Sequence, residues 1–206
     1  MEIKGKVSLI TGGSKGIGFA IAESLVKSGS NVFICARDKS ELRRAVGDLR
    51  RFGNAEGEVC DVRSEEQVRM MLEECERVFG GVDILINNAG VASYGNPATM
   101  NFDDAFREMN VNYFGALRMS RALAPQMIER GSGMIVNIAT AFAKINLPLV
   151  GTYCASKAAM LSLGQALRAY LKDKGVHVMT VMPTTIDTDM AKGADVPKMT
   201  PEFVAG

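Results

Sequence analysis

Six short and almost continuously apolar runs constrain the fold of this chain more than any other feature. They are Lys6–Thr11, Asn31–Ala36, Ala55–Cys60, Val82–Ala89, Gly133–Ala139 and Val176–Met182. A strand that is hydrophobic throughout, rather than at alternate positions, is typical of a parallel sheet that is covered on both faces. Longer helical stretches separate the runs. The pattern therefore predicts an α/β fold, with a doubly wound parallel sheet of six or seven strands and helices on both faces.

The stretches between the runs carry helix signals. The first helix has an apolar stripe that ends before Gly29, and Ser64 begins a later helix in a capping box. Two longer helices are expected at about Phe102–Arg130 and about Tyr153–Lys174. Pro125 lies inside the former, so we expect that helix to kink or to be capped there.

Charge and composition exclude several classes of function. The chain has 206 residues with 24 Lys and Arg against 23 Asp and Glu, a net charge of +1. Such a balance argues against a protein that binds nucleic acid or an anionic membrane. No apolar stretch is long enough to span a bilayer, and the N-terminus does not resemble a signal peptide. We expect one domain over residues 1–206 and a cytoplasmic location.

The four cysteines and the single histidine lack the spacing of a disulfide framework or a metal site. Cys35, Cys60, Cys75 and Cys154 form no CxxC pair, and His177 is distant from all of them in sequence. We therefore expect reduced thiols and no metal.

A glycine-rich segment lies between the first strand and the first helix. It reads Thr11-Gly12-Gly13-Ser14-Lys15-Gly16-Ile17-Gly18. Glycines allow a ligand to approach the backbone, and a helix N-terminus offers N–H donors with a partial positive charge. The segment is not a Walker loop, because no Gly-Lys-Ser/Thr follows. It predicts a pyrophosphate site of dinucleotide type, with a simple tight turn as the alternative.

The second strand ends in Ala36-Arg37, and Lys15 lies in the glycine loop. In this architecture a carboxylate at the strand end binds the ribose 2′-hydroxyl of NAD, whereas an arginine accommodates the 2′-phosphate of NADP. Two cations without a carboxylate at the tip favour NADP. Asp38 is interpreted as the cap of the next helix. Arg37 taken alone would be a solvated surface charge.

These and later motifs resemble the short-chain dehydrogenase/reductase family over about Lys6–Met190, in its single-domain branch with the TGxxxGxG loop. The later motifs are Asp61-Val62, Asn87-Asn88-Ala89-Gly90, Asn112 in Val-Asn-Tyr-Phe-Gly, Tyr153-Cys-Ala-Ser-Lys157 and the segment Pro183–Thr188. The resemblance implies a Rossmann fold and an NAD(P)-dependent oxidoreductase that acts on a carbonyl or an alcohol. The sequence is most similar to 3-oxoacyl-carrier-protein reductases.

Tyr153 and Lys157 are four residues apart on a predicted helix and therefore share a face. A phenol has a pKa near ~10, and a neighbouring ammonium lowers it. Tyr153 would then donate a proton to a carbonyl oxygen as hydride arrives. Outside this motif the pair would be surface neighbours.

The resemblance assigns two further catalytic positions. Thr140 stands where the family has serine, thirteen residues before Tyr153, and keeps a hydroxyl for the substrate oxygen with a stiffer χ1. The alternative is a strand residue in an impaired site. Asn112 matches the asparagine that holds a water linking the lysine to solvent. Alternatively, it interrupts a helix by local hydrogen bonding.

The resemblance also implies the cofactor contacts. Asp61 and Val62 would contact the adenine, and Pro183, Ile186 and Thr188 the nicotinamide. The remaining contacts would come from Gly12, Ser14, Lys15, Gly16, Ile17, Gly18, Arg37, Asn88, Ala89, Gly90, Tyr153 and Lys157.

We therefore expect an NADPH-dependent reductase of a ketone or 3-oxoacyl group, with a small-molecule substrate. The alternatives are an NADP-dependent alcohol, sugar or steroid dehydrogenase and a non-catalytic NADP-binding regulator. By analogy, the two long helices would pair copies into a homodimer or homotetramer. Thr200 and Pro201 resemble the start of a helix. Relatives complete that helix and add a strand, so the domain is expected to be short of both.

Overall fold

The computed structural model describes residues 2–192 and 197–206. Six parallel strands form its sheet, in the order β3-β2-β1-β4-β5-β6. The strands are β1 (Val7–Thr11), β2 (Asn31–Ala36), β3 (Ala55–Val59), β4 (Ile84–Asn87), β5 (Gly133–Ile138) and β6 (Val176–Val181). The predicted doubly wound parallel sheet is confirmed, with strand ends one or two residues inside most of the predicted runs.

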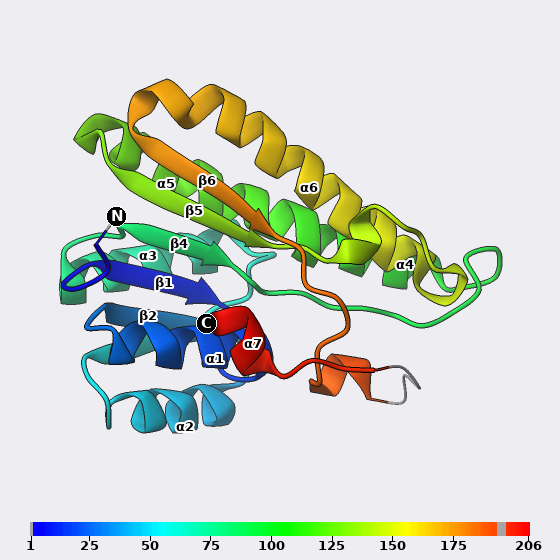
Figure 1. Cartoon of the computed structure of the whole chain (residues 1–206), viewed down its shortest axis with the longest axis horizontal. Coiled ribbons are helices and arrows are strands. Elements are labelled where there is room, and N and C mark those ends of the chain that lie inside the picture. The colour runs from blue at the N-terminus through cyan, green and yellow to red at the C-terminus, as the bar shows by residue number, and fades with distance from the viewer. Residues whose placement is uncertain (1, 193–196) are drawn as a thin grey trace.

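Helices cover both faces of the sheet, as predicted (Figure 1). The helices of one face are α1 (Gly16–Lys27), α2 (Lys39–Leu49) and α7 (Pro201–Ala205), and those of the other are α3 (Glu65–Phe79), α5 (Ala116–Arg130) and α6 (Gly151–Leu171). Strand β1 contributes side chains to both cores: Leu9 belongs to the core beneath α3 and α5, and Ile10 to the core beneath α1 and α2. This two-sided burial explains why β1, β2 and β4 are almost continuously apolar.

The helix ends follow the sequence signals. The Ser64 hydroxyl accepts a hydrogen bond from Gln67 N at the start of α3, and Asp38 accepts one from Glu41 N at the start of α2. Thr200 precedes α7 with Pro201 in its first turn. His177 is exposed on β6, the edge strand.

The prediction of a single helix at about Phe102–Arg130 is wrong in one respect. The chain forms α4 (Phe102–Glu108), then a π-helical segment η1 (Met109–Gly115), then α5. Pro125 lies inside α5, which continues past it. The break therefore falls at Asn112 and not at the proline, because tertiary contacts of the Asn112 side chain require the wider turn there.

The strand order reverses between β1 and β4, which is where open α/β sheets bind their ligands. Short turns follow the carboxyl ends here: η2 (Ala141–Ala143) and η3 (Pro148–Val150) precede α6, and η5 (Asp189–Ala191) follows β6. A last turn, η4 (Lys172–Lys174), leads from α6 into β6 at the opposite end. The fold thus brings the predicted motifs to one edge of the sheet.

Candidate active site

One cavity of about 860 Å³ lies beyond the carboxyl ends of the strands and collects most of the predicted site. The predicted residues on its wall are Gly12, Ser14, Lys15, Gly16, Ile17, Arg37, Asp61, Val62, Asn88, Ala89, Gly90, Tyr153, Lys157 and Thr188. Five other predicted residues do not line the cavity: Gly18, Asn112, Thr140, Pro183 and Ile186. The cavity is therefore continuous from the glycine loop to the tyrosine–lysine pair.

The glycine loop is held against the end of β4. Thr11 Oγ1 accepts hydrogen bonds from the N–H groups of Asn88 and Ala89, both at 3.0 Å. The Asn88 amide donates to Thr11 O at 2.9 Å and to Gly12 O at 3.1 Å. Gly12 has a φ of 66°, in the left-handed region, and a Cβ there would lie 3.0 Å from Ala89 Cα. Asn88 therefore supports the glycine loop.

The start of α1 has the features of an anion site. The first turn contains no acidic residue, and Lys15 at its N-cap makes no side-chain capping bond. A Cβ on Gly18 would overlap the Gly12 carbonyl oxygen, so this glycine lets the helix pack closely under the loop. The N–H groups of the first turn thus face the cavity with a glycine cradle beside them. This cradle fits a dinucleotide pyrophosphate.

The end of β2 carries more charge than its sequence indicated. Arg37 is exposed on the cavity wall, with no ion pair within the described residues. Lys15 Nζ lies 3.3 Å from Glu41 Oε1 and 3.5 Å from Asp189 Oδ2. The sequence predicted two cations without a carboxylate at the strand tip, and the structure adds Glu41 of α2 and Asp189 of η5 as partners of Lys15. Both ion pairs are solvent-exposed and thus weak.

Tyr153 and Lys157 lie on the first two turns of α6, and both line the cavity. Lys157 is 3% exposed, and its Nζ donates a hydrogen bond to Ile138 O at 2.8 Å. Burial lowers the pKa of Lys157 to about 8. Burial raises the pKa of Tyr153 well above its usual range, and Cys154, Tyr94 and Glu108 add to this effect. The expected lowering of the Tyr153 pKa is not found in this structure, because burial of the phenol disfavours its charged form.

Asn112 is fully buried in η1 and bridges three elements. Its Oδ1 accepts from Val91 N, and its Nδ2 donates to Val91 O, both at 2.9 Å. Nδ2 also donates to Ser156 Oγ at 2.8 Å, and Ser156 Oγ donates to Tyr153 O at 2.7 Å. A Cβ on Gly90 would lie 3.4 Å from both Asn112 Oδ1 and Lys157 Nζ. The Asn112 amide thus joins the turn of Tyr153 to the loop after β4.

Thr140 lies at the end of β5 and is 4% exposed. Its Oγ1 donates to Pro183 O at 3.1 Å and accepts from Phe142 N at 3.3 Å. The hydroxyl thus connects the ends of β5 and β6. Ile186, also predicted to face the cofactor, is buried and pairs with Met199 in an isolated bridge.

Several wall residues were missed by the sequence reasoning. They include Asp38, Glu41, Cys60, Val111, Ile138, Asp187 and Asp189. Cys60 and Ile138 come at or just after strand ends, so the carboxyl-end rule could have found them. The others reach the cavity through loop and helix packing, for which spacing gives no signal.

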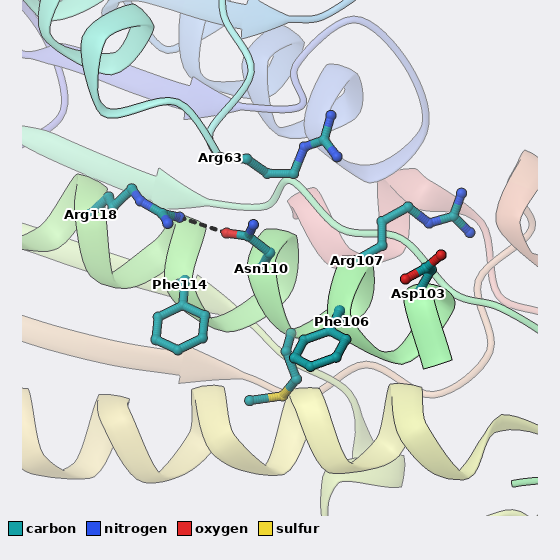
Figure 2. Close-up of a pocket in the computed structure, with 8 residues that line it drawn as sticks. Arg63, Asp103, Phe106, Arg107, Asn110, Phe114 and Arg118 are labelled. Atoms are coloured by element: carbon teal, nitrogen blue, oxygen red, sulfur yellow. Dashed lines mark hydrogen bonds between the residues drawn. The ribbon is translucent and has the colours of Figure 1, made fainter. Parts of the chain in front are cut away.

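A second hollow of about 440 Å³ lies outside the predicted site, on the outer face of α4 and η1 (Figure 2). Arg63, Arg107 and Arg118 point into it from three elements, above Phe106 and Phe114. Arg118 Nη1 donates to Asn110 Oδ1 at 3.0 Å.

Neither a membrane span nor a metal cluster was found among the described residues. None of their helices is long and apolar enough to cross a bilayer. No group of three or more His, Cys, Asp or Glu side chains in residues 2–192 and 197–206 is arranged to hold a metal ion.

Known proteins match nearly the whole chain. The family profile described as short chain dehydrogenase matches residues 6–197. A putative ketoacyl reductase of Streptomyces coelicolor is 36% identical over 189 residues, which is 90% of this chain and 72% of that protein. An uncharacterized oxidoreductase of Mycobacterium tuberculosis is 36% identical over 215 residues, 99% of this chain. The chain spans 63% of the length of that relative.

Solved structures agree with this match. A variant of actinorhodin polyketide ketoreductase with NADPH has a TM-score of 0.92 at 30% identity, over 100% of this chain and 88% of that chain. A gluconate 5-dehydrogenase from Burkholderia cenocepacia, in complex with NADP and tartrate, has a TM-score of 0.92 at 26% identity. The match covers 99% of this chain and 87% of that chain. The fold, the matched residues and these relatives together identify the chain as a member of the short-chain dehydrogenase/reductase family.

Proposed function

We propose that this chain is an NADPH-dependent reductase of a ketone or 3-oxoacyl group. The observation that carries the proposal is the single cavity of about 860 Å³, whose wall has the glycine loop and Arg37 in one part and Tyr153 with Lys157 in another. A dinucleotide in this cavity would have its phosphates at the start of α1. Its reactive ring would then be near the tyrosine.

The choice of NADP rests on charge. Arg37 is exposed on the cavity wall and has a fixed positive charge, which suits a 2′-phosphate. Lys15 is close by, and its two exposed ion pairs are weak enough to exchange for a phosphate. Two structural neighbours were solved with NADP or NADPH, which supports the same choice.

Tyr153 would protonate the substrate oxygen. A phenol, with a pKa near ~10, is protonated at neutral pH, which is the state that a proton donor needs, and burial raises this pKa further. The bound nicotinamide supplies the hydride for the carbonyl carbon. Lys157, with its pKa near 8, remains mostly protonated at pH 7 and stabilises negative charge developing at that oxygen. Thr140 would orient the same oxygen after its hydroxyl releases Pro183 O.

The dehydrogenase direction is the second candidate, because one structural neighbour is a gluconate 5-dehydrogenase. The same residues would then accept a proton from an alcohol. A non-catalytic regulator is the third candidate, since the Thr140 hydroxyl is bonded to Pro183 O.

A substrate panel separates these candidates. Purified protein is assayed with NADPH and NADH on ketones and 3-oxoacyl thioesters, and with NADP on sugars, steroids and simple alcohols. We expect NADPH oxidation on at least one carbonyl class, and its loss in Tyr153→Phe. Tyr170→Phe, which changes an exposed tyrosine on the same helix, is the matched control. Full activity of Tyr153→Phe contradicts the proton-donor role, and cofactor binding without turnover favours the regulator.

We further propose that copies of the chain associate through α4, η1 and α6. Phe102, Phe106 and Phe114 are exposed along α4 and η1, next to α6. An apolar surface of this kind marks an interaction site. Either a homodimer or a homotetramer would cover it.

A further inference from the structure

Glu108 is a buried carboxylate for which the proposed reaction gives no role. It is 0% exposed at the last residue of α4. Oε1 accepts a hydrogen bond from Ser93 N at 2.6 Å, and Oε2 is shielded from solvent without a partner among the described residues. Burying a carboxylate is costly unless hydrogen bonds offset the lost hydration. A carboxylate in such a position therefore calls for a specific reason.

The loop after β4 supplies that reason. Glu108 binds the backbone of Ser93, and Asn112, four residues further along the helix, binds the backbone of Val91. The two side chains thus bind alternate residues of the loop. Helix α4 and η1 hold the backbone of Val91 and Ser93 by side-chain hydrogen bonds.

Tyr94 is the next residue of this loop, and it reaches across to the segment after β6. Its hydroxyl donates to Met190 O at 3.4 Å, and Met190 lines the cavity. Tyr94 also lies near enough to Tyr153 to raise the pKa of that phenol. Gly95 N donates to Leu149 O at 2.9 Å, which joins the loop to η3. The loop thus passes beside the proton donor, between two other segments of the cavity mouth.

We propose that Glu108 is a positioning residue, that Tyr94 is the specificity-determining residue it holds in place, and that both act on the carbonyl substrate rather than on the dinucleotide. The inference rests on the proposed function. Tyr94, Met190 and Leu149 are exposed apolar side chains on these three joined segments. Together they suit a ketone with an apolar substituent, such as an aryl group or an acyl chain.

The test compares Glu108→Gln with Glu108→Met. Glutamine keeps an oxygen that accepts from Ser93 N, and methionine does not. We expect Glu108→Met to raise the KM of an aryl ketone about tenfold or more, because a charge-assisted hydrogen bond to the loop is lost. We expect Glu108→Gln to restore KM to within about threefold. In both variants the Kd of NADPH should stay within about twofold of the wild-type value.

Two further variants sharpen the test. Arg107→Gln is the matched control, because Arg107 Nη2 contacts Ser93 Oγ at 3.0 Å and Asp104 Oδ1 at 3.0 Å, and the bond from Ser93 N to Glu108 does not involve it. It should leave KM nearly unchanged. Tyr94→Ala should raise the KM of an aryl ketone more than that of acetone. An equal effect on both ketones would overturn the specificity role.

Amide hydrogen exchange gives a readout that does not need turnover. Residues 91–94 should exchange faster in Glu108→Met than in the wild type, and at the wild-type rate in Glu108→Gln. Unchanged exchange in Glu108→Met overturns the clamp. If the wild type reduces no carbonyl compound, the proposed function fails, whereas the exchange data still decide whether Glu108 holds the loop.

Discussion

Burial acts on Tyr153 and Lys157 in the same sense, because it disfavours the charged form of each side chain. The tyrosine is thereby kept as an acid, and the lysine is brought within reach of deprotonation above pH 8. Their spacing of four residues could be read directly from the sequence. The direction of the Tyr153 pKa shift could not, because it depends on burial of the phenol and on Tyr94 and Glu108 from two other segments.

Thr140 offers a test at the scale of one hydroxyl. Thr140→Ser keeps the donor, so we expect kcat/KM to stay within about fivefold. Thr140→Val removes it and should lower kcat by about 10²–10³, the usual loss for one oxyanion donor. Steady-state kinetics measure both, with NADPH affinity as the control. Near wild-type kcat in Thr140→Val would exclude a role at the substrate oxygen.

Arg37 offers a test of cofactor choice. Arg37→Asp replaces the cation facing the 2′-phosphate by a carboxylate that suits a 2′-hydroxyl. We expect the preference for NADPH over NADH, measured as the ratio of the two Kd values, to reverse. Arg43→Asp makes the same charge change at an exposed position of α2 away from the cavity wall and should leave the ratio unchanged. A preference for NADH in the wild type would contradict the choice of NADP.

At the scale of elements, the segment from α4 to α5 departs most from a regular pattern. Its apolar spacing predicts one helix, and Pro125 is the obvious local irregularity. The π-helical turn instead occurs where Asn112 reaches Val91 and Ser156, and where Gly115 packs against Val62. These partners are distant in sequence, so helix periodicity carries no information about them. The caps of α2 and α3, in contrast, involve neighbours three residues apart and were predicted.

Gly115→Ala tests the contact between η1 and the loop that carries Val62. An added Cβ would lie 2.7 Å from Val62 Cγ2, so the two elements must separate. We expect a loss of about 1–3 kcal/mol in the free energy of unfolding, as for other overpacked sites. NADPH affinity should fall as well, because Val62 lines the cavity.

Gly47→Ala is the matched control for this substitution. Gly47 lies in α2, with open space where the Cβ would be placed. We expect the free energy of unfolding to rise by about 0.5–1 kcal/mol, because alanine has a higher helix propensity than glycine. Urea unfolding measures both variants. Equal effects of the two substitutions would contradict close packing at Gly115.

At the scale of the whole molecule, the strand order assembles the site. Glycine loop, Asn88 and Arg37 come from three adjacent strands, and Tyr153 comes from the helix that follows β5. All of them reach the same edge because the strands are parallel. The same architecture buries Lys157 in the middle of the domain, and this has a consequence for stability.

The burial of Lys157 predicts how stability depends on pH. Burial lowers the pKa of Lys157 to about 8 in the folded chain, whereas its ordinary pKa of 10.5 applies in the unfolded chain. Between these values the unfolded state binds more protons, so raising the pH favours the folded state. Between pH 7 and pH 10, the free energy of unfolding of the wild type should rise by up to about 3 kcal/mol relative to that of Lys157→Met. Urea titrations at several pH values measure this, and a pH-independent difference would contradict it.

The exposed phenylalanines of α4 and η1 predict the assembly. Phe106, 63% exposed, lies on the proposed shared face. A glutamate placed opposite its own copy brings like charges together, so Phe106→Glu should shift the sedimentation coefficient toward the monomer. Phe52→Glu changes an exposed phenylalanine outside α4, η1 and α6 and should leave it unchanged. A monomeric wild type would contradict the proposed association.

The sequence by itself determined the parallel sheet, the order of its elements, the glycine loop and the spacing of Tyr153 and Lys157. Those features depend on periodicity and on neighbours within a few residues, which a linear pattern records. The tertiary structure alone decided the partner of Thr140, the direction of the Tyr153 pKa, the π-helical turn and the burial of Glu108 against Ser93. Each of these depends on desolvation and on contacts between segments distant in sequence, because packing creates both.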